Sequence, residues 1–261
     1  MCSIVGLQGK FKGNDLIKML GASKNRGPDS TGIYLDNVIS NIDLDDFSDD
    51  NDYEIALGHN LLDVYDLYDR KSMPQPVKVD NLVLVLNGAL YNFATIRNFL
   101  KKVGVEDEIN SDADALLYLI DFYNSGDLLK AIQMSLKLID GDYAFAVFDG
   151  ENLALVRDPL GVKPLFYAES DELCAFASAR DSLYELGFEE IQTLLPEHIL
   201  FNWNDVAPAQ AVYEKIMEVD EIKLNKLLKL SVSKRVEGLY EVGVIFSGGV
   251  DSAGDIMQQK A

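Results

Sequence analysis

The chain has 261 residues, of which 48% are hydrophobic, and a formal net charge of −20. This length and composition can bury a full hydrophobic core, so the sequence predicts a globular protein. The strong negative charge argues against binding of nucleic acid or of an anionic membrane through a general basic surface.

Strand-like apolar runs recur along the chain, at 2–8, 54–60, 81–88, 143–149, 152–158, 165–168 and 173–178. Segments with helical periodicity lie between them, at 15–24, 92–104, 112–126 and 127–140. Several strand-like runs are apolar at nearly every position, which is typical of sheets covered on both faces. The pattern predicts an α+β fold of stacked sheets with helical layers outside.

After about residue 205 the character of the sequence changes. Residues 206–261 contain a candidate linker, then an amphipathic helical segment at 219–236 and an apolar run leading into a glycine turn at 241–261. These elements cannot bury a core of their own. We therefore expect one domain at 2–205 and the beginning of a second domain at 206–261.

No apolar stretch approaches the roughly 20 residues of a membrane-spanning helix, and no signal peptide is visible at the N-terminus. We expect a cytoplasmic protein that has no membrane partner. The two cysteines, Cys2 and Cys174, do not form a disulfide framework, and a reducing compartment leaves both as thiols. The acidic segment 41–54 predicts a solvated surface loop, with metal binding as the minor alternative.

The position of Cys2 behind the initiator methionine raises a chemical possibility. Cysteine is small enough for Met1 to be removed, which leaves a thiol and a free amino group on one residue. That amine, with an ordinary pKa of about 7.7–8.0, can take the thiol proton directly or through a water. By itself, a cysteine in second position is more often chance than an active site.

Two further segments carry groups that suit such a nucleophile. RGPDSTG at 26–32 is turn-forming. NGALYN at 87–92 follows an apolar strand, so the Asn87 amide and the Gly88 N–H could converge beyond the end of that strand. A donor pair of this kind suits a developing oxyanion, and each donor is worth about 3–4 kcal/mol of barrier. Taken alone, each segment is more typical of an ordinary turn.

Eight motifs together resemble one family, the glutamine-dependent asparagine synthetases. In chain order they are MCSIVG, RGPDSTG, GHNLLDVYD, NGALYN, NSDADAL, IDGDYAFAVFD, VRDPLGVKPLFY and SGGVDS. The resemblance implies a class II glutamine amidotransferase domain with the four-layer αββα sandwich of N-terminal-nucleophile hydrolases. It also implies that the tail is a linker followed by the first strand, loop and helix of an α/β ATP-pyrophosphatase domain.

The resemblance assigns roles to individual residues. Cys2 corresponds to the nucleophile that forms a γ-glutamyl thioester, and Asn87 and Gly88 correspond to the oxyanion hole. Asp112 matches the carboxylate that holds the glutamine α-ammonium. Arg26–Gly27 lie where the family walls the nucleophile, a role we assign to backbone and packing. No cofactor is implied for this domain.

The motif SGGVDS resembles the pyrophosphate-binding loop of the family, with Ser247, Gly248, Gly249, Asp251 and Ser252 as candidate ATP-binding residues. Glycines allow the backbone to approach phosphate oxygens, and a helix N-terminus adds partial positive charge. An unrelated glycine turn is the alternative, and the Gly-Lys-Ser/Thr ending of a Walker A loop is absent. In the family, ATP with Mg²⁺ activates aspartate here, and ammonia from the cysteine site attacks the acyl-adenylate.

The implied ligands are therefore glutamine, aspartate and ATP, and the resemblance also suggests a homodimer. No metal site is expected in this domain, because His59 and His198 lack metal-ligand spacing and are interpreted as structural.

Smaller departures from the family are Ala179, in place of a glutamate after Ala177 and Ser178, and a Leu-Pro-Glu-His turn at 195–198.

Two departures affect recognition of the substrate. Leu61 stands where the family places an arginine that grips the glutamine α-carboxylate, and losing such a bond costs about 1.5–3 kcal/mol. Ala89 replaces a glutamate that shapes the pocket. We favour weak glutamine hydrolysis with Arg70 or Lys71 as substitute cation. The alternatives are a different amide, or a structural or regulatory domain of an enzyme that uses free ammonia.

The sequence thus predicts an asparagine-synthetase-type, glutamine-hydrolysing amidotransferase. A sibling enzyme that amidates another carboxylate is a rival, because the acceptor pocket would lie beyond residue 261. A catalytically silent binding module is the rival of another class.

Overall fold

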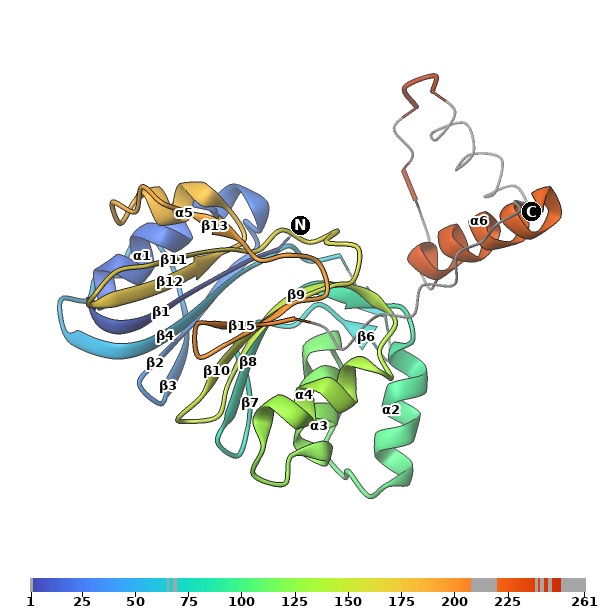
Figure 1. Ribbon diagram of the computed structural model, residues 1–261, viewed down its shortest axis with the longest axis horizontal. Coiled ribbons are helices and arrows are strands. Elements are labelled where there is room, and N and C mark those ends of the chain that lie inside the picture. The colour runs from blue at the N-terminus through green and yellow to red at the C-terminus, as the bar shows by residue number, and fades with distance from the viewer. Residues whose placement is uncertain are drawn as a thin grey trace. The chain divides into compact units, whose positions relative to one another are not determined.

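The computed structural model describes residues 2–64, 66–67, 70–207, 220–237, 239, 242–243 and 246–249 (Figure 1). The chain divides into two compact units, Met1–Pro208 and Ala209–Ala261. Among the described residues, no helix is both long and apolar enough to span a membrane.

The first unit contains a seven-stranded antiparallel sheet in the order β13-β11-β12-β1-β4-β2-β3. Its strands are β1 (Ser3–Lys12), β2 (Ser30–Leu35), β3 (Val38–Ile42), β4 (Asp52–Leu61), β11 (Phe166–Glu169), β12 (Leu173–Ala177) and β13 (Gln192–Thr193). The strand that follows Cys2 is therefore central, flanked by β12 and β4.

A second antiparallel sheet of six strands has the order β15-β14-β10-β9-β8-β7. Its strands are β7 (Val77–Val79), β8 (Leu82–Leu90), β9 (Gly141–Phe148), β10 (Leu153–Arg157), β14 (Ile199–Phe201) and β15 (Asn204–Val206). A short two-stranded sheet pairs β5 (Asp66–Leu67) with β6 (Arg70–Lys71).

Helices cover the outer face of each sheet (Figure 1). The seven-stranded sheet carries α1 (Gly13–Ala22), the 3₁₀ turn η1 (Lys24–Arg26) and α5 (Arg180–Tyr184). The six-stranded sheet carries α2 (Phe93–Lys102), α3 (Asp112–Tyr123) and α4 (Leu128–Leu136). Three apolar clusters fill the spaces between the four layers. The α+β, αββα prediction is confirmed.

The strand β8 shows why the apolar runs lack alternation. Leu82, Leu84 and Leu86 pack against the helices α2–α4, whereas Val83 and Val85 pack in the cluster between the two sheets. Successive side chains of a strand point to opposite faces, and here both faces are covered. A continuous apolar run therefore satisfies both layers at once.

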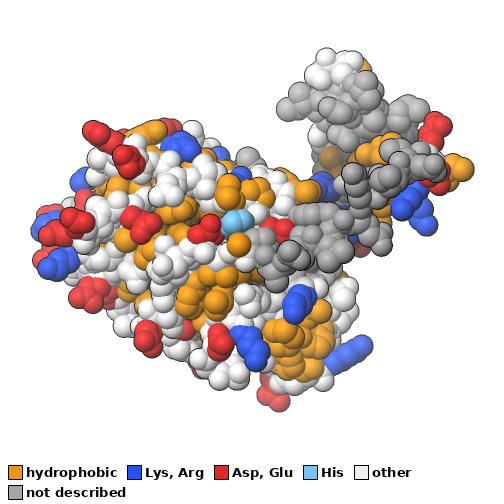
Figure 2. Space-filling model, viewed as in Figure 1, with side chains coloured by type: hydrophobic (Ala, Val, Ile, Leu, Met, Phe, Trp, Pro, Cys, Tyr) orange, Lys and Arg blue, Asp and Glu red, His pale blue; other side chains and the backbone are white. Residues whose placement is uncertain are grey.

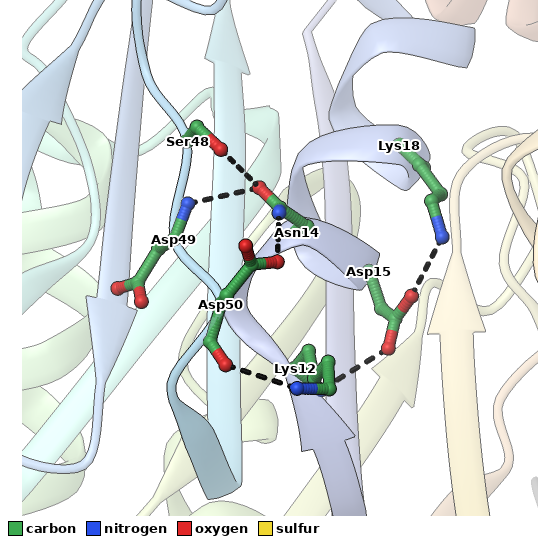
Figure 3. Close-up of polar contacts among 7 residues, drawn as sticks. All are labelled: Lys12, Asn14, Asp15, Lys18, Ser48, Asp49 and Asp50. Carbon is green, nitrogen blue, oxygen red and sulfur yellow. Dashed lines mark hydrogen bonds and ion pairs between the residues drawn. The ribbon is translucent and has the colours of Figure 1, made fainter.

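The acidic segment between β3 and β4 lies on the surface, and its carboxylates are exposed apart from the half-buried Asp49. The backbone and side chains of this loop are nevertheless hydrogen-bonded to the start of α1 (Figure 3). Asn14 Oδ1 accepts from Ser48 Oγ at 3.3 Å and from Asp49 N–H at 2.9 Å. Asn14 Nδ2 donates to Asp50 Oδ1 at 2.6 Å, and Lys12 Nζ donates to the Asp50 carbonyl at 3.1 Å. Across the described ranges, no cluster of His, Cys, Asp and Glu could hold a metal ion.

In the second unit, α6 (Glu221–Val236) is N-capped by Asp220, whose carboxylate accepts from Ile222 N–H at 2.9 Å. This helix corresponds to the segment predicted at 219–236, and none of its residues is buried. On the face shown in Figure 2, acidic side chains are spread over the first unit with hydrophobic patches between them.

Candidate active site

Cys2 lies immediately before β1 and is half-buried. Its Sγ accepts from Leu62 N–H at 3.4 Å and lies 3.8 Å from the Leu62 carbonyl oxygen, to which the thiol can donate. Burial raises the pKa of the Cys2 thiol, and the Leu62 backbone and the charge of Lys163 oppose that rise. The thiol therefore stays protonated near neutral pH, and a nucleophilic thiolate requires a base beside it.

A cavity of about 210 Å³ opens beside this thiol. It is lined by Cys2, Leu61, Leu62, Val64, Lys71, Ser72, Met73, Gln75, Leu86, Asn87, Gly88, Ala89, Ser111, Asp112, Ala113 and Lys163. The structure thus brings the predicted nucleophile, both predicted oxyanion donors and the predicted ammonium-binding carboxylate to one pocket. Leu61 and Ala89, the two departures from the family pattern that were expected to affect substrate recognition, also line this pocket.

The two candidate oxyanion donors lie within β8, so the prediction that they follow the end of the strand is wrong. Asn87 pairs with Ala144 and Gly88 with Tyr143, because β9 continues the ladder as far as Leu90. A Cβ at position 88 would lie 2.6 Å from the Asp142 carbonyl oxygen and 2.8 Å from Tyr143 Cα. Only glycine fits this close approach of two backbones.

Ser178 connects the oxyanion donor to the strand that carries the nucleophile. Its Oγ accepts from Ile4 N–H at 3.0 Å, and its own N–H donates to the Ile4 carbonyl at 2.8 Å. Asn87 Nδ2 donates to the same Oγ at 3.4 Å. An amide nitrogen carries two N–H groups, so Asn87 has a second one with which to contact an oxyanion. The sequence analysis mentions Ser178 only because the next residue, Ala179, departs from the family pattern, and it assigns no role to Ser178.

Arg26 and Gly27 are not among the described residues that line the pocket. A Cβ at position 27 would lie 2.3 Å from the Asn60 carbonyl oxygen, so this backbone packs tightly on the end of β4. Asp29 N–H donates to the Leu61 carbonyl at 3.0 Å, one residue before the Leu62 that contacts the thiol. The segment supports the wall around Cys2 through its backbone. Burial lowers the pKa of Arg26, and the nearby Cys2 opposes the shift.

Asp112 is the first residue of α3, after the N-cap Ser111, whose Oγ accepts from Asp114 N–H at 3.1 Å. The Asp112 Oδ2 atom lies 2.8 Å from Arg70 Nη2, and each of these two side chains is only 10% exposed. Arg70 Nη2 also donates to the Leu90 carbonyl at 3.2 Å. Burial raises the pKa of Asp112, and the charge of Arg70 opposes the rise.

Arg70 and Lys71 are the two predicted substitutes for the arginine that the family places at position 61, and the structure puts them in different environments. Arg70 is buried against Asp112 and is not among the described residues that line the pocket, whereas Lys71 lines it. Gln75, another lining residue, is fixed by two bonds to the Leu86 backbone, of 2.6 Å to the N–H and 3.2 Å to the carbonyl.

The remaining predicted residues lie elsewhere. Ser247, Gly248 and Gly249 are exposed residues of the second unit, with Gly248 at φ +81°. Asp251 and Ser252 lie outside the described residues, as do residues 241, 244 and 245 of the predicted strand before the glycine turn; the described residues 242, 243 and 246 of that segment are not in a strand. His198 Nδ1 lies 2.7 Å from Asp205 Oδ1, and His59 is fully buried in β4.

A thiol at the head of a central strand, amide donors on the facing sheet and an αββα sandwich define an N-terminal-nucleophile amidotransferase fold. Residues 1–236 match the family model described as glutamine amidotransferase domain. The chain belongs to this family, and several of its relatives are named as asparagine synthetases.

A Methanocaldococcus jannaschii protein named putative asparagine synthetase (glutamine-hydrolyzing) 1 is 34% identical over 97% of this chain and 50% of its own length. Glutamine–fructose-6-phosphate aminotransferase (isomerizing) of Clostridium perfringens is 28% identical over 90% of this chain and 44% of its own length. The chain thus spans about half the length of these curated relatives.

Among solved structures, glutamine phosphoribosylpyrophosphate amidotransferase from B. subtilis, complexed with ADP and GMP, is similar with a TM-score of 0.65 and 19% identity. The similarity covers 99% of this chain and 64% of that one. At this identity the likeness establishes the fold.

Proposed function

We propose that this domain releases ammonia from glutamine at Cys2. We also propose that the whole protein is a cytoplasmic enzyme of the asparagine-synthetase type, which transfers that ammonia to aspartate activated by ATP and Mg²⁺. One observation carries the first proposal: the Cys2 thiol, the Asn87 amide and the Gly88 backbone line a single small pocket. The glutamine amidotransferase family of the chain supports the same reaction.

The reaction follows from these groups once Met1 has been removed. The α-amine of Cys2 takes the thiol proton, and the thiolate attacks the carboxamide carbon of glutamine. The carbonyl oxygen becomes an oxyanion that the Asn87 and Gly88 N–H groups bind. The protonated amine then donates to the departing nitrogen, which leaves as ammonia while a γ-glutamyl thioester forms. Water, activated by the same amine, hydrolyses the thioester to glutamate.

The acceptor half of the proposal depends on resemblance. The M. jannaschii relative, named as an asparagine synthetase, aligns with 97% of this chain, including most of the second unit. The motif SGGVDS favours an ATP-using partner domain over one that handles a sugar phosphate. The fructose-6-phosphate aminotransferase relative is named for a sugar phosphate, so it does not bear on the rival, a sibling enzyme that amidates another carboxylate.

The glutaminase proposal has a direct test on the chain as it stands. Intact mass measures removal of Met1, and a diazoketone analogue of glutamine is expected to add one adduct, on Cys2. Ammonia release from glutamine should fall at least about 10³-fold in Cys2→Ala, because the nucleophile is lost. Cys174→Ala is the matched control, and we expect it to keep full activity.

Retained Met1 would refute the mechanism, since the α-amine would then belong to the wrong residue. Equal ammonia release by wild type and Cys2→Ala would refute the assignment of the nucleophile.

A further inference from the structure

The Gln75 side chain belongs to the pocket wall but has no part in the reaction described above. Gln75 is 8% exposed and lines the cavity beside Cys2. Its Oε1 accepts from Leu86 N–H at 2.6 Å, and its Nε2 donates to the Leu86 carbonyl at 3.2 Å. One side-chain amide thus satisfies both polar backbone groups of a residue in β8, as a neighbouring strand would.

These two bonds stand where a strand would otherwise continue. In the ladder between β7 and β8, Val77 pairs with Leu84, and β7 does not extend to Leu86. If the same antiparallel register were continued, the residue opposite Leu86 would be Gln75 itself. The side chain of Gln75 therefore extends this ladder after the backbone pairing has stopped, and it holds β8 one step nearer to the active site.

The next backbone group on this edge of β8 is an oxyanion donor. In an antiparallel sheet, the polar backbone groups of successive residues point to opposite edges of a strand. Those of Leu86 and Gly88 therefore point to the side of β7, whereas those of Asn87 point to β9. Gly88 presents its N–H at the edge that β7 does not reach, and Gly88 lines the pocket there. Gln75 holds the same edge two residues earlier.

The backbone of Gln75 is packed against the other sheet. A Cβ at position 32, in β2, would collide with the Gln75 carbonyl oxygen, so only glycine fits there. This contact gives the last glycine of the RGPDSTG motif a structural role. Because β2 belongs to the seven-stranded sheet whose central strand follows Cys2, Gln75 links the sheet of the nucleophile to the strand of the donors. It does so separately from Ser178.

We propose that Gln75 is a positioning residue of the oxyanion hole. Its side-chain amide holds β8 at Leu86, directly before Asn87, and so fixes the Asn87 and Gly88 donors relative to Cys2. This inference rests on the proposed glutaminase function and adds a residue that acts through the two donors without contacting the reacting atoms. An oxyanion hole depends on donors that are already in place when negative charge develops, so a shift of this edge should affect kcat and leave KM nearly unchanged.

Gln75→Glu is the most direct test, because it replaces one nitrogen atom by oxygen. The ionised carboxylate still accepts from Leu86 N–H, but its second oxygen then faces the Leu86 carbonyl with no proton between them. At pH 8, kcat for glutamine should fall by about 10²-fold, the factor typical of a displaced catalytic group, while KM changes by less than about threefold. Steady-state ammonia release measures both constants.

Acid should rescue this variant. A protonated carboxyl donates its O–H to the Leu86 carbonyl and restores both bonds, and burial raises the pKa of such a group above its ordinary value of about 4.3. The ratio of kcat between variant and wild type should therefore rise by about tenfold or more as the pH falls from about 8 to about 5.5. The other titratable groups around this site are common to both proteins: Cys2, Lys71, Asp112 and Lys163 line the pocket, and His59 pairs with Gly32.

Alkylation of Cys2 separates positioning from a general loss of structure. Iodoacetamide is attacked by the thiolate at its CH₂ carbon and loses iodide, so no oxyanion forms and the donors are not needed. The rate of Cys2 alkylation, read by peptide mass mapping, should stay within about threefold of wild type while turnover of glutamine falls.

Two further variants complete the test. Gln75→Met is similar in size and makes neither bond, so its kcat should be low at every pH, without rescue by acid. Gln133→Glu introduces the same change at an exposed residue of α4 that does not line the pocket, and it is the matched control.

The outcomes distinguish this inference from the function on which it rests. A kcat within about threefold of wild type in both Gln75→Glu and Gln75→Met would overturn the inference and leave the glutaminase intact. An equal loss of Cys2 alkylation, or failure of both variants to fold, would assign Gln75 to the stability of the pocket as a whole and overturn it too. If only Gln75→Glu does not fold at pH 8, Gln75→Met decides. No ammonia release by wild type, together with an unlabelled Cys2, would refute the glutaminase function itself and this inference with it.

Discussion

The two ends of the Cys2 pocket differ in how the protein builds them. At the reacting end, Asn87 and Gly88 are held in the paired backbones of β8 and β9, Cys2 directly precedes the central strand β1, and Ser178 joins the two sheets between them. At the recognition end, the charges stand on a short strand and on the first turn of a helix. An oxyanion hole depends on fixed positions, whereas a carboxylate can be bound by any cation within reach. The residues that recognise the substrate can therefore change while the residues that carry out the reaction stay the same.

The largest effect is expected at the reacting end. Asn87→Ala removes one oxyanion donor, so kcat for glutamine should fall by about 10²- to 10³-fold while KM changes by less than about threefold. Steady-state ammonia release measures both constants. Asn81→Ala, which changes an exposed amide remote from the pocket, is the control. A change confined to KM would place Asn87 at the recognition end and break the distinction between the two ends.

A smaller effect, in the other kinetic constant, is expected at the recognition end. Leu61 lines the pocket, and Leu61→Arg should lower KM for glutamine by about 10- to 150-fold with little change in kcat, because a new guanidinium can bind the α-carboxylate. Leu61→Met, similar in volume and uncharged, is the control. No effect on either constant would mean that position 61 does not face the donor.

Combining this change with Lys71→Gln sharpens the comparison further. If both cations bind the same carboxylate, their effects on KM should not add, because either one can satisfy it. Additive effects would indicate that the two side chains act on different groups of the donor.

Much of the fold is predictable because local pattern and burial agree. The continuous apolar run of β8 indicates a strand covered on both faces, and the acidic residues Asp112 and Asp114 indicate a helix start at Asp112. The motifs also predict which residues gather at the pocket, since their order along the chain resembles that of a known family.

What sequence reasoning missed depends on pairs of residues that are distant in the chain. Ser178 meets Asn87 across 91 positions and Ile4 across 174. Arg70 meets Asp112 across 42 positions, so the sequence offers it as a candidate substrate ligand although the structure buries it in the wall. The prediction that Asn87 follows the end of a strand is wrong for a similar reason, because the pairing of β9 decides where β8 ends.

The last effect, on stability and on neither kinetic constant, concerns His59, a fully buried residue of β4 two positions before Leu61. Burial lowers the pKa of His59 to about 3. The unfolded chain binds a proton near pH 6.5 and the folded one does not, so the stabilising contribution is complete above pH 6.5 and is lost as the pH falls toward 3. The free energy of unfolding should therefore decrease by about 1.4 kcal/mol for each pH unit between 6 and 4 from this residue.

Urea unfolding at several pH values measures this dependence, and the comparison with His59→Gln isolates it. Burial raises the pKa values of Asp112 and Asp114, and these carboxyls therefore stabilise the fold as the pH falls, against the histidine. Both are present in wild type and variant, so the difference between the two curves reports His59 alone. The stability of wild type relative to the variant should rise with pH by about 1.4 kcal/mol for each unit between 4 and 6, and this difference should be constant above pH 6.5. Parallel curves would show that His59 is protonated in the folded chain, in which case acid would not weaken the strand that carries Leu61 into the recognition end.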